Sequence, residues 1–229
     1  MILILEIAYL LSVWVVPVLL AITMHEAAHG YVAWRLGDPT AMRAGRVTAN
    51  PLKHIDPVGT LLLPGLLLLV RAPFLFGFAK PVPVDFSKLR KPKRDMVLVA
   101  IAGPASNLLL AILSALLIGL ESILPASAGL WLVSNLENSI IINLLLAIFN
   151  LIPLPPLDGG RVAVGLLPRS LGWRLAKLEK FGLFILLGLL FIVPMLMKEI
   201  GVVFDPLHWL LIVPVQGLFD LLRGIIGVP

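Results

Sequence analysis

"MHEAAHGYVAW", residues 24–34, places two histidines and a glutamate inside a long apolar run. The run covers about residues 5–36, and an α-helix needs roughly 20 residues to cross the hydrocarbon core of a bilayer. His25 and His29 are four residues apart, so on a helix they lie on one face, one turn from each other. Ionisable side chains at such a depth are costly and mark functional sites. The stretch therefore predicts a membrane-spanning helix that carries a site.

The composition of the 229-residue chain agrees with a membrane protein. Hydrophobic residues make up 59% of the chain and charged residues 14%, which is too little charge to cover the surface of a soluble domain of this size. The chain has no cysteine, so disulfides, thiolate ligands and cysteine nucleophiles are excluded. The net charge of +5 comes from basic residues beside apolar runs, as in cytoplasmic flanks. The expected surroundings are a lipid bilayer, and no nucleic-acid partner is indicated.

Further apolar runs cover about residues 96–120, 135–152, 181–197 and 204–222. Basic groups follow the first run, precede the second and follow the third, so the positive-inside rule places all three groups in the cytoplasm. The stretch 58–76 is broken by prolines, a glycine and Arg71. A full crossing there would violate the charge pattern, which favours a re-entrant or interfacial segment. The expected fold class is an all-α polytopic protein of the plasma (inner) membrane with five or six transmembrane helices.

Two short segments between the runs, 44–48 and 77–84, are expected to be extended. Pro81 and Pro83 alternate in the second segment and remove backbone donors on one side, which is typical of an edge strand. We therefore expect a short β-hairpin or edge strand near the site. An edge strand can hold an unwound peptide by strand addition. The residues of this strand that we expect to contact substrate are Lys80, Val82 and Val84.

The histidine pair is a candidate metal site. Neutral imidazoles one helical turn apart are a ready pair of ligands, and Glu26, beside the first, can act as base on a metal-bound water. The alternative is a pair of histidines that hydrogen-bond to neighbouring helices, with a glutamate that reaches the interface. The chain has only four histidines, so two of them at this spacing around a glutamate favour the metal.

A catalytic zinc takes three protein ligands and keeps one position open, so a third ligand is required. "NLIPLPPLDGG", residues 150–160, contains the best candidate. Its prolines end the helix and leave irregular backbone, which a membrane tolerates where protein or a water-filled cavity surrounds it. Asp158 can direct a carboxylate inward there; alternatively it caps a turn at the surface. Both motifs lie near basic cytoplasmic residues, so they can meet in the cytoplasmic half of the bilayer.

These two motifs, with "GDPTAMRAGRVTANPLKHIDPVGT" (37–60) and "AGPASN" (102–107), resemble the site-2 protease family of intramembrane zinc metalloproteases. The resemblance is to the short, stand-alone branch without a PDZ or CBS domain, and it covers about residues 15–165. It implies hydrolysis of peptide bonds within or near the transmembrane segments of membrane proteins. The expected organisation is one membrane-embedded metalloprotease domain over 1–229, with a catalytic core at about 5–165 and accessory helices at about 181–224.

The resemblance also implies roles for individual residues. It implies that one zinc ion per chain is bound by His25, His29 and Asp158. It implies that Glu26 is the general base on zinc-activated water, and that Asn150 steadies the substrate or the oxyanion. The implied partner is a transmembrane protein or peptide substrate.

Two further polar residues have two interpretations each. Asn107 lies in the middle of an apolar run, where a polar group serves either interhelical packing or the positioning of a site. His54 can line the site or be a hydrogen-bonded structural histidine in a polar loop. Both remain candidate site-lining residues.

Other functions fit parts of the pattern. Two histidines and a carboxylate also describe the triad of non-haem iron oxygenases, but that chemistry gives Glu26 no role. A non-catalytic metal-binding membrane protein, or a transporter whose broken helix at 150–160 holds an ion, is the alternative from a different class. Internal inverted symmetry would support the transporter, and the sequence shows none.

Overall fold

The computed structural model describes residues 2–69, 77 and 79–226. Most of the described chain is helical. Four helical stretches are long and apolar enough to cross a membrane, which confirms a polytopic helical membrane protein. They are Ile4–Arg35, Pro92–Ile123, Ala126–Asn150 and Gly182–Glu199. The fifth predicted run, 204–222, is largely helical but is not among these four.

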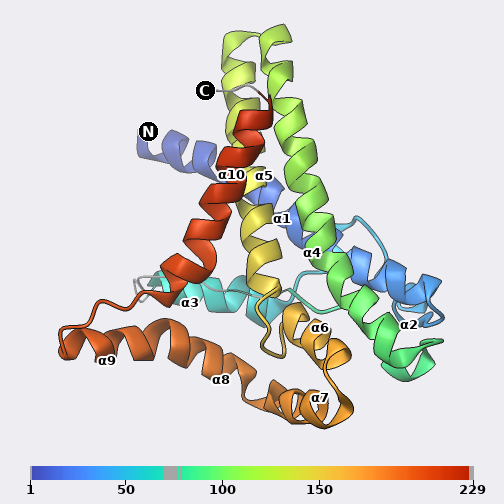
Figure 1. The fold of residues 1–229 in the computed structure, drawn as a ribbon. Helices are drawn as coiled ribbons and strands as arrows, with labels where there is room; N and C mark the ends of the chain where they lie inside the picture. The colour runs from blue at the N-terminus through green and yellow to red at the C-terminus, as the bar shows by residue number, and fades with distance from the viewer. Residues whose placement is uncertain (1, 70–76, 78, 227–229) are drawn as a thin grey trace.

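The centre of the fold is a core of three helices. α1 (Ile2–Arg35), α4 (Pro92–Leu117) and α5 (Ala126–Asn150) pack against one another in pairs. The 3₁₀ helix η4 (Ile118–Ile123) continues α4, and α10 (Val213–Ile226) packs on α4 and α5 (Figure 1). The buried apolar cluster between α4, η4 and α5 comprises Ala111, Ala115, Ile118, Ile140 and Leu144.

Small residues allow this close packing. Ala111 and Ala115 are four residues apart along α4, so they lie on one face of the helix, and Gly103, about two turns earlier, is buried as well. In a membrane, small residues at a helix interface let two backbones approach closely, and van der Waals contact then holds them together. Ala111 and Ala115 face α5, and Gly103 meets the histidines of α1.

The chain after α1 returns to the same end of the molecule. Asp38 is fully buried, and its carboxylate accepts hydrogen bonds from the backbone N–H of Thr40 at 3.0 Å and of Asp85 at 2.6 Å. These bonds fasten the end of α1 to the segment that precedes α4. The short elements between them are α2 (Thr40–Arg43), η1 (Pro51–Lys53), η2 (Pro57–Leu62), α3 (Leu63–Leu69) and η3 (Phe86–Lys88).

Two predictions for this region are not confirmed. The re-entrant or interfacial segment predicted at 58–76 is helical as far as residue 69, and the rest of it lies outside the described residues. Residues 44–48 and 79–84 contain no strand, so the β-hairpin is not found in the part of the chain that the structure describes. Pro81 and Pro83 have no N–H to donate, and the N–H of Val82 bonds to a side chain instead of to a neighbouring strand.

The second half of the chain folds back beneath the core. α6 (Asp158–Leu166) packs on α4, and α7 (Arg169–Ala176) packs on α6. The apolar stretch Gly182–Glu199 runs across the lower end of α5 in Figure 1. Its elements are α8 (Gly182–Leu187), η6 (Gly188–Ile192) and α9 (Val193–Glu199), preceded by η5 (Lys177–Lys180) and followed by η7 (His208–Ile212).

The three basic groups of the sequence gather at one end of the molecule. The N–H of Arg90 donates to the carbonyl of Leu36, which joins the end of α1 to the start of α4. Nζ of Lys93 donates to the carbonyl of Leu167, at 2.6 Å, which joins the start of α4 to the end of α6. In Figure 1 this end lies at the lower right, where α2, the start of α4, α6 and α7 meet.

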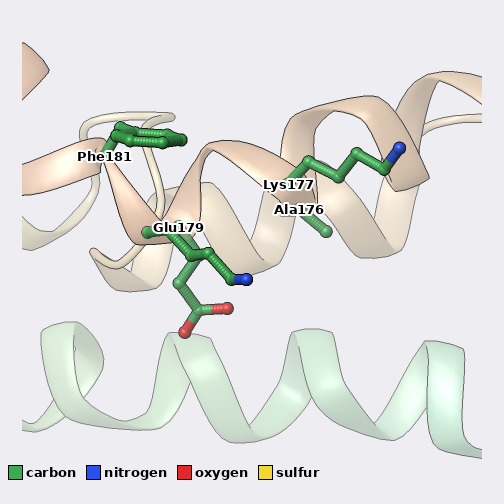
Figure 2. Close-up of a pocket in the computed structure, with 5 residues that line it drawn as sticks. Ala176, Lys177, Glu179 and Phe181 are labelled. Carbon is green, nitrogen blue, oxygen red and sulfur yellow. The ribbon is translucent and has the colours of Figure 1, made fainter.

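The turn between α7 and α8 belongs to the same end. Figure 2 shows Lys177, Glu179 and Phe181 around a surface hollow of about 490 Å³. Nζ of Lys177 lies 3.3 Å from the centre of the Trp173 ring, and Trp173 and Phe181 are exposed. Basic side chains beside exposed aromatic rings are typical of a helix at the membrane interface.

Candidate metal centre

Three side chains from distant parts of the chain form a compact triangle. Nε2 of His25 and Nε2 of His29 are 3.0 Å apart. Each lies 3.2 Å from Oδ2 of Asp158. The three residues are buried, with exposed fractions of 6–8%. α1 supplies the histidines and the first residue of α6 supplies the carboxylate.

The triangle has the size that a small cation requires. In a tetrahedral zinc site with ligand bonds of about 2.0–2.1 Å, neighbouring ligand atoms are roughly 3.3 Å apart. The observed separations of 3.0 and 3.2 Å are close to that edge. Oδ2 of Asp158 is buried and has no hydrogen-bond partner, which is costly for a carboxylate unless an ion or donor satisfies it. The donor set of two imidazoles and a carboxylate suits zinc.

Both histidines are held by their other ring nitrogen. Nδ1 of His29 lies 2.7 Å from the carbonyl oxygen of Val99, and Nδ1 of His25 lies 2.6 Å from the side-chain oxygen of Asn107. A backbone carbonyl can only accept, so Nδ1 of His29 donates and its Nε2 keeps a lone pair. Metal-ligating histidines are held in this way by a second layer of hydrogen bonds. Of the two interpretations of Asn107, the contact with His25 favours the positioning of the site.

α4 approaches the histidines through a glycine. A Cβ built on Gly103 would lie 2.6 Å from Nε2 of His25, and closer still to Nε2 of His29. Any larger residue at this position would therefore occupy the space in front of the two Nε2 atoms. The glycine of "AGPASN" thus keeps a wall of the site open at a point where two helices touch.

Glycines also place Asp158. A Cβ on Gly159 would overlap the carbonyl of Leu151, and one on Gly160 would overlap the backbone of Pro155. The loop 151–157 therefore folds directly onto the first turn of α6, and Asp158 stands at the start of that turn. The prolines that end α5 and the glycines that start α6 together set the direction of the carboxylate.

A cavity of about 510 Å³ opens beside the triangle. Its lining includes the three metal-site residues together with Glu26 and Asn150, and its other walls are mainly apolar. The carboxylate of Glu26 accepts a hydrogen bond of 2.7 Å from the N–H of Val82. The side-chain nitrogen of Asn150 donates to the carbonyl of Leu146, one turn back in α5. The two motifs of the sequence thus share one cavity.

The segment 79–84 forms part of the wall of this cavity. Val82 and Val84 line it, whereas Lys80 is exposed and is not among its lining residues. The backbone of Lys80 is instead held on both sides: its N–H donates to the carbonyl of His54 at 2.9 Å. Its carbonyl accepts from Nη2 of Arg46 at 2.6 Å. Within this segment the backbone of Lys80 thus faces His54 and Arg46, whereas the N–H of Val82 faces Glu26 in the cavity.

His54 and Arg46 are buried beneath this segment, with exposed fractions of 2% and 7%. His54 is not among the residues that line the cavity; its Nε2 lies 3.1 Å from the carbonyl of Thr48. Burial lowers the pKa of His54 below its ordinary value, and the charge of Arg46 lowers it further. In the sequence Arg46 belongs to the basic group that follows the first apolar run, and no pattern there distinguishes it from its exposed neighbour Arg43.

The chain is similar to a known peptidase family and to proteins named as zinc metalloproteases. The pattern of peptidase family M50 matches residues 125–193, which include the loop that carries Asp158. YwhC of Bacillus subtilis, whose name proposes a zinc metalloprotease, is 42% identical over 187 residues, 79% of this chain and 80% of YwhC. Rip2 of Mycolicibacterium smegmatis, named in the same way, is 31% identical over 194 residues, 83% of this chain and 70% of Rip2. No solved structure matches.

The fold and the donor set fit the class of membrane-embedded metalloproteases. The chain belongs to peptidase family M50 and is a metalloprotease. The names of both relatives specify zinc as the metal.

Proposed function

We propose that the protein is an intramembrane zinc metalloprotease that hydrolyses peptide bonds within or near the transmembrane segments of membrane proteins. The observation that carries the proposal is the buried triangle of His25, His29 and Asp158, which lies between helices apolar enough to cross a membrane. One zinc ion per chain would be held by these three residues. The whole chain would form one domain, with its catalytic core at about 5–165 and accessory helices at about 181–224.

The residues around the triangle divide the chemistry between them. When bound, zinc polarises the scissile carbonyl and lowers the pKa of a coordinated water to about 7. Glu26, in the same cavity, takes the proton of the attacking water and passes it to the leaving amine. Asn150 lines the cavity at the end of α5 and steadies the substrate or the developing oxyanion. His25 and His29 keep their Nε2 lone pairs for the metal, because their Nδ1 atoms are bonded elsewhere.

The segment 79–84 holds the substrate. A helical substrate hides its carbonyls in its own hydrogen bonds, so it must unwind before cleavage, and an unwound strand can be held by backbone pairing. Val82 and Val84 line the cavity and contact the unwound stretch. Lys80 contributes from outside the cavity, because its backbone is already bonded to His54 and Arg46. Cleavage that persists after residues 79–84 are scrambled would exclude this role.

The site lies in the cytoplasmic half of the plasma membrane. Three basic groups gather at the end of the molecule where α1 ends, α4 begins and α6 packs. Asp158 lies three residues before Arg161, at that same end. Excess lysine and arginine mark the cytoplasmic side, which supports this orientation.

The test pairs metal content with cleavage. The purified chain and its Glu26→Gln variant are assayed for bound metal and for cleavage of a panel of single-span substrates in lipid. About one zinc per chain in both, with cleavage by the parent alone, is the expected result. Asp158→Ala is expected to lose both zinc and cleavage, because it removes one of three ligands.

Other outcomes separate the alternatives. Zinc in both proteins and cleavage by neither, across the panel, would favour a non-catalytic metal-binding protein or a transporter. Bound iron in place of zinc would favour an oxygenase-type site. If Asp158→Ala loses the metal but folds as the metal-free parent does, Asp158 is assigned to the metal site.

A further inference from the structure

Asn107 is one end of a buried chain of side chains that runs from the metal site into the core. Its nitrogen Nδ2 donates to the carbonyl of Ala21 at 3.1 Å and to the side-chain oxygen of Asn143 at 2.8 Å. Nδ2 of Asn143 donates in turn to the carbonyl of Ser139 at 2.8 Å. Asn107 and Asn143 are almost completely buried, with exposed fractions of 0% and 1%, so water does not compete for these bonds.

The chain has a fixed direction because both of its anchors are backbone carbonyls. The carbonyls of Ala21 and Ser139 can only accept hydrogen bonds. Asn143 must therefore turn its nitrogen toward Ser139 and its oxygen toward Asn107. Asn107 must then turn its nitrogen toward Asn143 and Ala21, which leaves its oxygen facing His25.

The orientation of Asn107 decides which nitrogen of His25 carries the proton. With an amide oxygen 2.6 Å away, Nδ1 must donate, so Nε2 keeps the lone pair that a metal requires. If the amide of Asn107 were reversed, its nitrogen would donate to Nδ1. The proton of neutral His25 would then lie on Nε2, at the position of the metal.

We infer that Asn143 is a positioning residue of the metal site: through Asn107 it fixes the tautomer of His25. The inference rests on the proposed role of His25 as a metal ligand. Asn143 lies in α5 and acts on His25 of α1 through Asn107 of α4. One hydrogen-bonded chain thus links the packing of three helices to the protonation of His25. Without the side-chain oxygen of Asn143, the orientation of Asn107 is held by the carbonyl of Ala21 alone.

The other histidine provides an internal comparison. Nδ1 of His29 bonds to the backbone carbonyl of Val99, which no side-chain substitution in α5 removes. A change at residue 143 should therefore alter His25 and leave His29 as it was. A merely structural role of Asn143 in the core would disturb the two histidines alike.

Asn138 offers a matched control in the same helix. Its Nδ2 also donates to a backbone carbonyl, that of Val13 in α1, at 3.0 Å, but it has no bond to Asn107. Asn143→Leu and Asn138→Leu thus each remove one asparagine of α5. Only the first breaks the chain that leads to His25. Asn143→Asp keeps an oxygen toward Asn107 and serves as the conservative variant.

The experiment has two readouts, neither of which is activity. The zinc dissociation constant of each full-length protein in detergent is measured by competition with a chelator. We expect Asn143→Leu to weaken zinc binding about tenfold, which is the lower end of the effect of outer-layer substitutions. We expect Asn138→Leu and Asn143→Asp to stay within about threefold of the parent.

The second readout is ¹⁵N NMR of the metal-free protein labelled at histidine. The chain has four histidines, and substitution of His54, His208 and His29, one at a time, assigns all four signals. In the parent at pH 8, we expect Nδ1 of both His25 and His29 to carry a proton, whatever the state of Nε2. In Asn143→Leu we expect a new population of His25 whose Nδ1 has lost its proton, and His29 unchanged.

Several results would overturn the inference. A parent His25 without a proton on Nδ1 does so without any variant, even if Asn143→Leu does not fold. Equal zinc affinities of Asn143→Leu and Asn138→Leu, or parallel changes of His25 and His29, do so as well. Absence of zinc from the parent would contradict the proposed function instead, because the tautomer is read from metal-free protein.

Discussion

Gly103 lies against His29 so closely that a single methyl group at residue 103 would overlap Nε2 of the imidazole. The two residues belong to different helices, α4 and α1, and meet at the point where the metal would be held. The missing side chain of Gly103 therefore does two things: it lets α4 pack against α1, and it leaves space for the ion.

Gly103→Ala should abolish metal binding. The added Cβ would lie 2.6 Å from Nε2 of His25 and nearer to that of His29, so either the methyl group excludes the ion or the helices separate. Zinc content measured by atomic emission should fall from about one ion per chain to near zero. Gly119→Ala is the control, because nothing lies within 4 Å of a Cβ there; an equal loss in both variants would contradict the prediction.

Gly182→Ala should destabilise the fold near the site. A Cβ at Gly182 would overlap the carbonyl of Pro155 in the loop that carries Asp158. Overpacking of this kind costs about 1–3 kcal/mol, so the thermal unfolding temperature should fall. Gly188→Ala, in the same apolar stretch but in open space, should leave that temperature unchanged. A displaced loop should also weaken zinc binding in Gly182→Ala alone.

Arg46→Gln should reduce catalysis without removing zinc. The guanidinium of Arg46 holds the carbonyl of Lys80, and two residues further on the N–H of Val82 bonds to Glu26. Loss of a hydrogen bond to a charged group costs about 1.5–3 kcal/mol, so the segment 79–84 should loosen. We expect kcat to fall at least tenfold, with metal content unchanged.

The control for this substitution is Arg43→Gln, because Arg43 is basic and near in sequence but exposed. It should cleave at the rate of the parent. Equal cleavage rates for Arg46→Gln and Arg43→Gln would show that Arg46 contributes only its positive charge and not its hydrogen bond to Lys80.

His54 should make the protein less stable in mild acid. Burial lowers the pKa of folded His54 below the ordinary value of 6.5, so the unfolded chain takes up a proton first as the pH falls. Stability should therefore be lost from about pH 6.5 down to the pKa of the folded state. Between pH 7.5 and 5.5 the thermal unfolding temperature should fall further for the parent than for His54→Gln. Each kcal/mol of lost folding free energy lowers that temperature by roughly 2–4 °C. Parallel curves would assign the acid sensitivity to other groups.

The sequence predicts the parts of the site that local spacing controls. Two histidines one helical turn apart must share a face, and they do. The prolines and glycines around Asp158 restrict the backbone strongly, so the turn that carries the carboxylate can also be foreseen. The membrane-spanning runs follow from hydropathy alone, and four of the five are found as candidate spans.

The remaining features depend on contacts between helices. Nothing in the sequence distinguishes buried Arg46 from exposed Arg43, because burial is decided by what packs above it. Asn143 and Asn138 are equally polar residues in one apolar helix, yet only Asn143 reaches Asn107. The predicted hairpin was not found among the described residues because the N–H of Val82 has a side-chain acceptor available in three dimensions.

The three metal-site residues also define a time during synthesis. His25 and His29 leave the ribosome first, and Asp158 follows roughly 130 residues later, which at about 5–20 residues per second takes on the order of 6–26 seconds. Throughout that interval the nascent chain contains the two histidines but lacks the carboxylate of Asp158. The three residues are therefore complete only after α1, α4 and α5 have been made, whereas the apolar stretch Gly182–Glu199 is made after them.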